Sequence, residues 1–350
     1  MTHSCRLVVA SALALVLASG VAGARVVAQD ASAAQPFGEW LADLRKEALA
    51  KGISVATVDQ ALTGIEPQPA VVQRDRTQAE RTLSIDDYLK RRIDRKTVKT
   101  AREMAKRHAG VLSKVSATYG VSPGIIVAIW GLESNFGRFS GVRPTIASLA
   151  TLAYDNRRAT MFRNELIDAL RILDRGDIDA ARMKGSWAGA MGQPQFMPSS
   201  YLKYAEDFDR DGKRDIWSSE ADVFASIGNY LKQSGWNAKA AWGRAVRLPK
   251  DASARLGAAA PLRQQGCEAA RQMSEALPLS RWRALGVRPI GRGALPRAEM
   301  LASLVRAGSR SYLVFDNYGA LLQYNCAHAY ALAVALLSEK IGPIPATGHK

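Results

Sequence analysis

The sequence of 350 residues predicts a mainly α (α+β) protein, helical over most of its length with a small α/β insertion near the C-terminus. Three observations support this fold class. Apolar residues recur at helical spacing over more than twenty residues, from Val98 to Tyr119. A nearly continuous apolar stretch, Gly124–Leu132, follows a helix-start signal at Ser122-Pro123. The helical pattern weakens after about Trp242, where short strand-like runs begin.

Composition and charge exclude several classes of protein. With 47% hydrophobic and 23% charged residues, the chain is globular and is not expected to be disordered. At roughly 150 residues per domain, its length suggests about two domains. Three cysteines cannot make a disulfide scaffold. The formal charge of +16 points to a polyanionic partner, which could be a nucleic acid, a membrane surface or a cell-wall polymer.

The first 28 residues resemble a secretory signal peptide. Met1–Arg6 is short and basic, Leu7–Val21 is almost wholly apolar, and small residues follow. This pattern predicts cleavage after Ala24 or Ala28. About fifteen apolar residues are few for a membrane-spanning helix. Cys5 precedes the apolar stretch, so the chain is not expected to be a lipoprotein, and we expect a soluble periplasmic protein.

Export changes how the charge and the cysteines are interpreted. Cleavage after Ala28 would remove Arg6 and Arg25 and leave a charge of +14. Export argues against a genomic nucleic-acid role and favours the cell wall or a membrane surface as partner. Cys267 and Cys326 would then lie in a compartment that permits disulfides, where they either form a bridge or remain two buried thiols.

The rest of the chain divides into four expected regions, taken in order. Residues 37–120 form an N-terminal helical region: two short helices broken at Gly52, an irregular segment over 63–82, and a long helix over 98–119 that Gly120 ends. Residues 121–241 form the core, with helices expected at 123–132, 144–154, 160–173, 198–206 and 221–234. Residues 242–320 form a small α/β module with short strands at 246–248 and 312–315. Residues 321–341 close the core with a helix over about 327–341.

Glu133 is the sharpest chemical feature of the sequence. It ends the apolar helix that begins at Pro123. Burial beside apolar surface disfavours a charged carboxylate and raises its pKa, which is what a general acid at neutral pH needs. The alternative is a glutamate at a helix end that turns into solvent or caps a neighbouring loop.

A second feature is the segment Gly185–Tyr201, in which small residues alternate with amide, hydroxyl and aromatic residues. Glycines let a backbone approach a ligand closely, and the polar side chains suit a substrate rich in hydroxyl groups. A close-packed connection between helices would produce a similar pattern.

Taken together, these motifs resemble the B-type lytic murein transglycosylases, which have a lysozyme-like helical catalytic core and cleave peptidoglycan. The resemblance extends over roughly residues 37–341. It rests on Glu133-Ser134-Asn135-Phe136-Gly137, on Gly189-Ala190-Met191-Gly192 continuing to Gln195-Phe196-Met197-Pro198-Ser199-Ser200, and on Tyr324-Asn325 with Tyr330. Cys326-Ala327 departs from the more polar stretch of the family, which affects the fine contacts there.

The resemblance implies a role for each matching residue. Glu133 takes the place of the sole catalytic acid and base. Ser186 and Gln195 match positions that contact the sugar and its N-acetyl group. The positions that line the groove are matched by Tyr88, Tyr230, Tyr324, Asn325 and Tyr330. Arg157 and Arg158 correspond to a basic pair that meets the carboxylates of the stem peptide, in keeping with the preference of arginine for carboxylates.

The mechanism implied by the family needs a single carboxyl group. Glu133 protonates the glycosidic oxygen between MurNAc and GlcNAc, and its carboxylate then accepts the proton of the MurNAc C6 hydroxyl as that oxygen closes a 1,6-anhydro ring. Asn325 or Gln195 would hold the acetamido group or the developing charge. No cofactor is expected for catalysis. The expected partner is peptidoglycan, and no nucleic-acid partner is expected. The protein is expected to be a monomer, with other cell-wall enzymes as candidate protein partners.

The acidic segment Asp207–Asp215 resembles the start of an EF-hand calcium loop. Carboxylates occupy positions 1, 3, 5 and 9, and glycine occupies position 6. Position 12 is Ser218, so the resemblance points to a later ligand. The expected ligands of a structural Ca²⁺ are Asp207, Asp209, Asp211, the carbonyl of Lys213, and Asp222. A solvated acidic turn is the alternative.

Two other functions fit the same sequence. One is a hydrolytic muramidase of the same fold that uses water and a second acid, such as Asp155 or Glu165. The other is a non-catalytic scaffold that binds peptidoglycan. A membrane-surface binder is a weaker third, because no exposed basic amphipathic helix is evident.

Overall fold

A computed structural model describes residues 35–77, 83–250, 252–291, 295 and 299–343. The predicted signal peptide, residues 1–28, lies outside the described residues. The helices are α1 (Phe37–Ala50), α2 (Val55–Leu62), α3 (Pro69–Thr77), α4 (Ile85–Arg92), α5 (Arg95–Arg107), α6 (Ala109–Tyr119), α7 (Pro123–Ser134), α8 (Thr145–Tyr154), α9 (Ala159–Asp174), α10 (Pro198–Tyr204), α11 (Glu220–Gln233), α12 (Ala252–Ala259), α13 (Glu268–Arg271), α14 (Leu279–Ala284), α15 (Asp316–Tyr324) and α16 (His328–Ile341). The strands are β1 (Arg143–Pro144), β2 (Lys184–Gly185), β3 (Gly243–Arg247), β4 (Leu277–Pro278), β5 (Arg288–Pro289), β6 (Leu301–Ala307) and β7 (Arg310–Val314). The predicted mainly helical class is confirmed.

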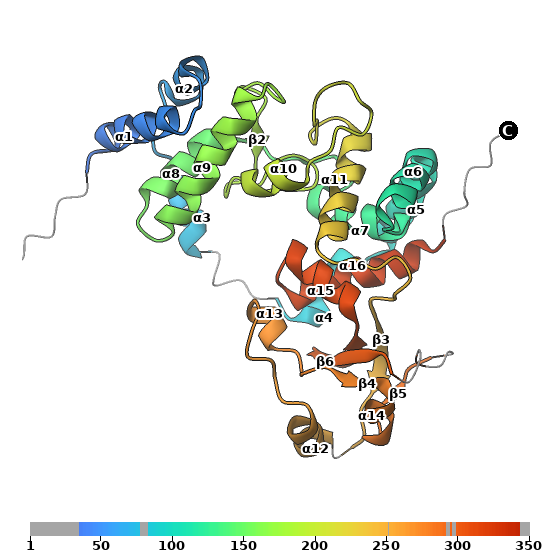
Figure 1. Ribbon diagram of the computed structural model, residues 1–350. Helices are drawn as coiled ribbons and strands as arrows, with labels where there is room; N and C mark the ends of the chain where they lie inside the picture. Colours follow the sequence, from blue (N-terminus) through green and yellow to red (C-terminus); the bar gives the residue numbers. More distant parts are fainter. Residues whose placement is uncertain (1–34, 78–82, 251, 292–294, 296–298, 344–350) are drawn as a thin grey trace, which may run out of the picture. The chain divides into compact units, whose positions relative to one another are not determined.

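Helix α7 is buried on all sides because nearly all of its side chains are apolar. Ten of its twelve residues are buried, and it contacts α5, α6, α11 and α16 (Figure 1). The helix starts as predicted, with Ser122 in an extended conformation and Pro123 as the first helical residue, although the Ser122 side chain makes no capping bond. At Gly124 a Cβ would lie 3.0 Å from Ser338 Oγ, so glycine permits the close approach of α16.

Two expectations about the N-terminal region are wrong. The single helix expected over 98–119 is two helices, α5 and α6, which meet at His108. The His108 ring packs edge-on against Trp130 and Phe224, with ring centroids 5.5 Å apart in both pairs. Because both helices bury one face in the same core, the apolar period continues across the break and hides it.

The segment 63–82, expected to be irregular, contains α3. The helix begins with Pro69 at its first position and buries Val71 and Asp75. The residue before the helix, Gln68, is bonded to α8: its backbone N–H donates to Thr151 Oγ1 at 2.9 Å. Packing against α8 therefore stabilises a helix that the local sequence alone does not predict.

The late α/β region is a five-stranded antiparallel sheet with the strand order β4-β6-β7-β3-β5. The strands expected at 246–248 and 312–315 are confirmed as β3 and β7. Tyr312 and Val314 belong to the main core, whereas Leu313 and Phe315 belong to a smaller core that also contains Trp282. Strand β6 was not predicted, because four consecutive buried residues give it no alternating pattern.

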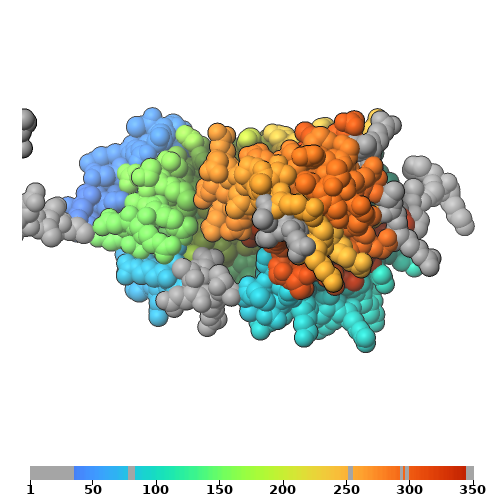
Figure 2. Space-filling model, turned by 90° about the horizontal axis from the view of Figure 1, so that it is seen from below, coloured from blue at the N-terminus to red at the C-terminus, as the bar shows by residue number. Residues whose placement is uncertain are grey.

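The β6–β7 turn is attached to α4. Asp86 Oδ2 accepts the Ser309 backbone N–H at 2.8 Å. Gly308, with a φ of +57°, leaves room for this carboxylate, because a Cβ there would lie 2.5 Å from Asp86 Oδ2. On the face drawn in Figure 2, the orange residues of the module form one continuous lobe. The contacts of Asp86 with the β6–β7 turn therefore anchor the module to α4, the helix that also carries Tyr88 and Arg92.

Cys267 and Cys326 form a disulfide, with Cα atoms 6.3 Å apart. This resolves the two possibilities that the sequence left open. Cys267 precedes α13 in the α/β module, and Cys326 lies between α15 and α16. The bond therefore ties the module to the segment that carries Tyr324 and Asn325.

No helix among the described residues is by itself both long and apolar enough to cross a membrane. Two bent pairs, α6 with α7 and α15 with α16, reach the required length and composition only together.

Removal of the disulfide should lower stability. Its cysteines are 59 residues apart, and loss of a native disulfide costs about 2–5 kcal/mol of unfolding free energy. Urea unfolding of Cys326→Ser should show this loss relative to oxidised wild type. Reductant should lower the stability of the wild type and leave the variant unchanged. Equal stability of oxidised wild type and variant would contradict the expectation.

Candidate functional site

Glu133 lies in the last turn of α7, where the sequence places it. The helix ends as Asn135 and Phe136 adopt positive φ values of 51° and 60°. Ser134 Oγ donates to the Trp130 carbonyl at 2.9 Å and accepts the Gly137 N–H at 3.0 Å. These bonds on both sides of the turn hold the end of α7 and, with it, the Glu133 backbone.

Burial raises the pKa of Glu133 from its ordinary value of 4.5 to about 7. The Tyr330 hydroxyl and the positive charge of Arg92 act in the opposite direction and limit the rise. Burial also raises the pKa of Tyr88, Tyr324 and Tyr330, and the charge of Glu133 adds to each increase. The four predicted residues Glu133, Tyr88, Tyr324 and Tyr330 are therefore close enough to influence one another, and Arg92 joins them.

The sequence did not single out Arg92. It is the last of three consecutive basic residues that end α4, and such a run is typical of an exposed helix end. Arg92 Nη2 instead donates to the Leu132 carbonyl. Its Nε is buried and has no hydrogen-bond partner in the part of the chain that the structure describes.

The segment 185–197 is fastened to α7 by Gln193, a second residue that the sequence did not single out. Trp130 Nε1 donates to Gln193 Oε1 at 2.6 Å, and Gln193 Nε2 donates to the Trp217 carbonyl at 2.8 Å. The two partners, the Trp130 indole and the Trp217 backbone carbonyl, are distant in sequence from Gln193, so no local pattern marks this glutamine. The segment is thus held in one position beside the helix of Glu133.

Ser186 and Gln195 are presented by this segment with part of their hydrogen-bonding capacity unused. Ser186 Oγ accepts the N–H groups of Ala188 at 3.2 Å and Ala190 at 3.1 Å, which leaves its hydroxyl proton available to donate. Gln195 has a φ of +53°, and its Nε2 donates to the Gly192 carbonyl at 2.8 Å. A side-chain amide held through its nitrogen keeps a carbonyl oxygen as a possible acceptor.

Three of the four tyrosines that were predicted to line a groove, Tyr230, Tyr324 and Tyr330, form one aromatic cluster, whereas Tyr88 lies on α4 with its ring beside Arg92. The ring centroids of Tyr230 and Tyr324 are 4.7 Å apart, and those of Tyr324 and Tyr330 are 6.3 Å apart in a stacked arrangement. Tyr324 Oη donates to the Pro194 carbonyl at 2.7 Å, which connects the cluster to the segment 185–197. Tyr204 extends the cluster, because its ring centroid lies 4.3 Å from that of Tyr230. Tyr204 was not predicted.

Asn325 directly follows α15 and is exposed to solvent. Its backbone carbonyl accepts the Ala327 N–H at 2.8 Å. Asn325 therefore lies between Tyr324 of the aromatic cluster and the disulfide at Cys326.

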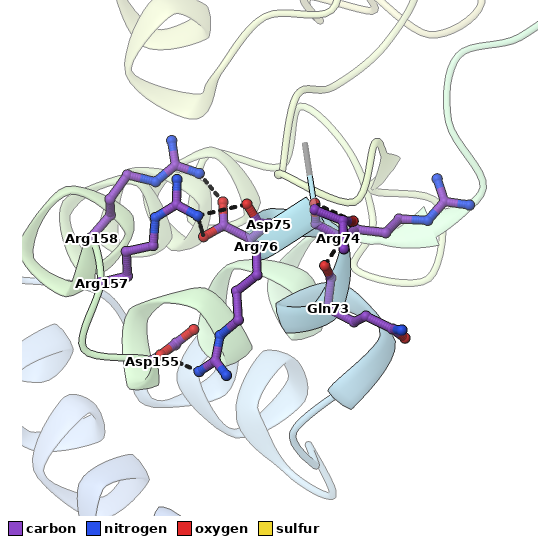
Figure 3. Close-up of polar contacts among 8 residues, drawn as sticks. Gln73, Arg74, Asp75, Arg76, Asp155, Arg157 and Arg158 are labelled. Carbon is purple, nitrogen blue, oxygen red and sulfur yellow. Dashed lines mark hydrogen bonds and ion pairs between the residues drawn. The ribbon is translucent and has the colours of Figure 1, made fainter. Parts of the chain in front are cut away.

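Arg157 and Arg158 share a buried carboxylate, as Figure 3 shows. Arg157 Nη1 lies 3.4 Å from Asp75 Oδ2 and donates to the Asp75 carbonyl at 2.7 Å. Arg158 pairs with Asp75 Oδ1 and lies over the Phe162 ring. Nearby, Arg76 of α3 pairs with Asp155 at 3.5 Å. The two arginines keep 48% and 38% of their side-chain surface exposed, so Asp75 orients them without covering them.

The acidic segment brings three of the five expected metal ligands together. Ligand oxygens of Asp207, Asp209 and Asp211 lie within 4.8 Å of one another. This donor set, all of oxygen, fits a hard cation such as Ca²⁺. Asp222 is fully buried, and its carboxylate accepts the backbone N–H groups of Phe208 at 2.7 Å and Asp215 at 2.8 Å. Asp222 thus holds the backbone of the loop in place. In the predicted site Lys213 contributes only its backbone carbonyl.

Comparison with known proteins gives the same family from three directions. Residues 36–339 match the model of the Transglycosylase SLT domain. The chain is 32% identical over 265 residues to the membrane-bound lytic murein transglycosylase B of Escherichia coli K12, an alignment that covers 73% of this chain and 66%, just under two thirds, of that relative.

Two solved structures are similar over most of the chain. SltB3 from Pseudomonas aeruginosa, in complex with NAG-anhNAM-pentapeptide, is 42% identical with a TM-score of 0.80, and the match covers 90% of this chain and 82% of SltB3. The Escherichia coli lytic transglycosylase Slt35, in complex with calcium, is 28% identical with a TM-score of 0.71, and the match covers 87% of this chain and 92% of Slt35.

The raised pKa of Glu133 predicts how stability depends on pH. The folded protein holds the Glu133 proton more tightly than the unfolded chain does, so this contribution is complete below pH 4.5 and is lost as the pH rises through about 7. At about 1.4 kcal/mol per pKa unit, Glu133→Gln, which is neutral at every pH, should be up to about 3 kcal/mol more stable than wild type at pH 8. The two should be equal near pH 4.

Urea unfolding at the two pH values measures this difference. The exposed Glu103 on α5 supplies the matched control, because Glu103→Gln removes a carboxylate at the surface. A Glu133→Gln variant no more stable than wild type at pH 8 would show that Glu133 is not held in a desolvated site.

Proposed function

Because the chain belongs to the B-type lytic murein transglycosylases, we propose that it cleaves the β-1,4 bond between MurNAc and GlcNAc of peptidoglycan without adding water. The products would carry 1,6-anhydroMurNAc ends. Glu133 is the proposed acid and base of this reaction.

The observation that carries the proposal is the environment of Glu133. A carboxyl group with a pKa of about 7 is protonated in half of the molecules at neutral pH, so it can donate a proton to the glycosidic oxygen. The resulting carboxylate is then basic enough to take the proton of the MurNAc C6 hydroxyl. The proton moves from Glu133 to the leaving GlcNAc oxygen and is replaced from the C6 hydroxyl, while the C6 oxygen forms the new bond to C1.

The polar residues of segment 185–197 and the aromatic cluster are proposed to bind the sugars. Ser186, through its unused hydroxyl proton, and Gln195, through its amide oxygen, would contact the N-acetyl group. Asn325, which follows α15, would hold the acetamido group or the developing charge. Tyr88, Tyr230, Tyr324 and Tyr330 would present flat, amphipathic surfaces to the sugar rings.

Arg157 and Arg158 are proposed to meet the carboxylates of the stem peptide. Support comes from their partly exposed guanidinium groups and from Asp75, which orients both. An arginine pair held in this way loses less side-chain entropy when it binds a carboxylate.

Hydrolysis with a second acid is less well supported. The candidate Glu165 accepts hydrogen bonds from the Ser199 N–H at 2.9 Å and the Ser199 hydroxyl at 2.7 Å, at the start of α10. The candidate Asp155 is paired with Arg76. Both carboxylates have structural partners, whereas Glu133 is surrounded by tyrosines and one arginine.

Product analysis on purified sacculi tests the proposal. Wild type should release anhydro-muropeptides, each one water lighter than the reducing product of a hydrolase. Glu133→Gln should lower the rate by at least about 10²-fold and stay folded. The wild-type kcat/KM should fall as the pH rises through about 7, because the acid must be protonated.

Three results would contradict the proposed function. Reducing ends would establish a muramidase. Anhydro products at a normal rate from Glu133→Gln would exclude Glu133. Binding to sacculi without any release would indicate a scaffold.

We also propose that the acidic segment binds a structural Ca²⁺. The carboxylates of Asp207, Asp209 and Asp211 and the carbonyl of Lys213 would hold the ion. Asp222 of α11, whose carboxylate also accepts the Phe208 N–H, would be the fifth ligand. Slt35, which is similar in structure, was crystallised with calcium. The bound ion would stabilise the loop that joins α10 to α11.

Calcium should raise the melting temperature of chelator-treated protein. Asp209→Asn should abolish most of this increase, because it removes one of the three clustered carboxylates. Asp179→Asn, which changes an exposed aspartate outside the loop, should leave it unaffected. Differential scanning fluorimetry with EDTA and then CaCl₂ makes the measurement. An equal calcium response in Asp209→Asn and wild type would exclude the site.

For the whole protein we propose a monomer that is exported and works in the periplasm on peptidoglycan strands. The net charge of +16 supports an anionic polymer as substrate. Other enzymes of the cell wall are the proposed class of protein partner.

A further inference from the structure

We propose that Arg92 is a positioning residue for Glu133: its guanidinium group holds the last turn of α7 in place and supplies the fixed positive charge beside which Glu133 ionises. The kinetic part of this inference rests on the proposed function, whereas the electrostatic part stands on the structure alone.

The first argument is the contact between Arg92 and α7. Arg92 Nη2 donates to the Leu132 carbonyl, next to Glu133 in sequence. The last carbonyls of a helix lack partners within the helix, and here the chain turns away at Asn135 and Phe136. A cation at a helix C-terminus is also favoured by the helix dipole. Arg92 therefore fixes the backbone from which the Glu133 side chain projects.

The second argument is the charge balance around Glu133. The titratable groups that act on Glu133, or on which Glu133 acts, come from three helices: Tyr88 and Arg92 from α4, Tyr324 from α15 and Tyr330 from α16. Burial raises the pKa of each of these tyrosines, so they are neutral at pH 7. Arg92 carries a permanent charge and is the cation of this group.

The third argument is that Arg92 is itself held in position. Its guanidinium carbon lies 5.9 Å from the centre of the Tyr88 ring, one turn earlier in α4. That helix is capped by Ser84, which accepts the Asp87 N–H at 3.1 Å, and is fastened to the β6–β7 turn through Asp86. The buried Arg92 Nε has no hydrogen-bond partner among the described residues, so one donor of the group is unused.

These features suit a carboxyl group that must change charge twice in one reaction. Glu133 becomes an anion in an apolar environment when it gives up its proton, and an anion without a nearby cation is costly there. Arg92 lowers that cost but leaves the burial effect dominant. Glu133 can therefore lose its proton and recover it within one catalytic cycle.

The test is a direct titration of Glu133 in the full chain. In protein labelled with ¹³C at the glutamate carboxyl carbon, the Glu133 signal is the one absent from Glu133→Gln. Arg92→Gln should raise the pKa of Glu133 by about one unit or more, because it removes an opposite charge. Arg92→Lys, which keeps the charge, should restore most of the wild-type value.

The matched control is Arg102 on α5, whose Nε donates to the Lys340 carbonyl near the end of α16 at 2.8 Å. Arg102→Gln also removes an arginine that caps a helix carbonyl, and it should leave the pKa of Glu133 unchanged. Arg92→Met serves as the second neutral variant if Arg92→Gln does not fold.

The kinetic readout is the high-pH limb of kcat/KM, which should move to higher pH in Arg92→Gln and return in Arg92→Lys. A folded neutral variant with an unchanged Glu133 pKa would overturn the inference and leave Arg92 as a helix cap only. If the pKa moves as expected but wild type releases no anhydro-muropeptides, the proposed function fails and the charge role of Arg92 stands.

Discussion

The desolvated carboxyl group of Glu133 is the constraint on which the rest of the site depends. A carboxylate at the end of an apolar helix is unfavourable, and the structure offsets this cost only in part. The Tyr330 hydroxyl and Arg92 favour the charged form, yet burial outweighs them and the pKa rises to about 7. Stronger compensation would leave Glu133 permanently ionised, and weaker compensation would keep it permanently protonated. Either extreme would remove one of the two proton transfers of the proposed mechanism.

Holding that group in place requires contacts between distant parts of the chain. Gln193 accepts a hydrogen bond from the Trp130 indole and donates one to the Trp217 backbone carbonyl, and so fastens the segment 185–197 to α7. Tyr324 bonds the same segment from the end of α15. Because these contacts exist without a bound substrate, the proposed sugar-binding residues would need less ordering when a substrate binds. The disulfide at Cys326 restrains the segment directly after Tyr324 and Asn325.

The excess of positive charge is only partly available for binding. Arg157 and Arg158 are neutralised in part by Asp75, and Arg76 pairs with Asp155. An arginine pair that shares a buried acid is oriented, and it loses part of its attraction for a second anion. The net charge therefore indicates the sign of the partner, whereas the position of each guanidinium group decides what it recognises.

The sequence by itself determined the helical class, the ends of α7, the position of Glu133 in its last turn, and the family, since all of these follow from local periodicity, helix-start signals and contiguous motifs. It could not separate α5 from α6, reveal α3 or β6, or choose between a disulfide and two thiols. It also could not identify Gln193, Asp75 or Arg92. Each of these acts through a partner far away in the chain, as Arg92 does through Leu132, forty residues later. The tertiary structure alone decided them, because burial and hydrogen bonding between distant segments exist only after those segments have packed together.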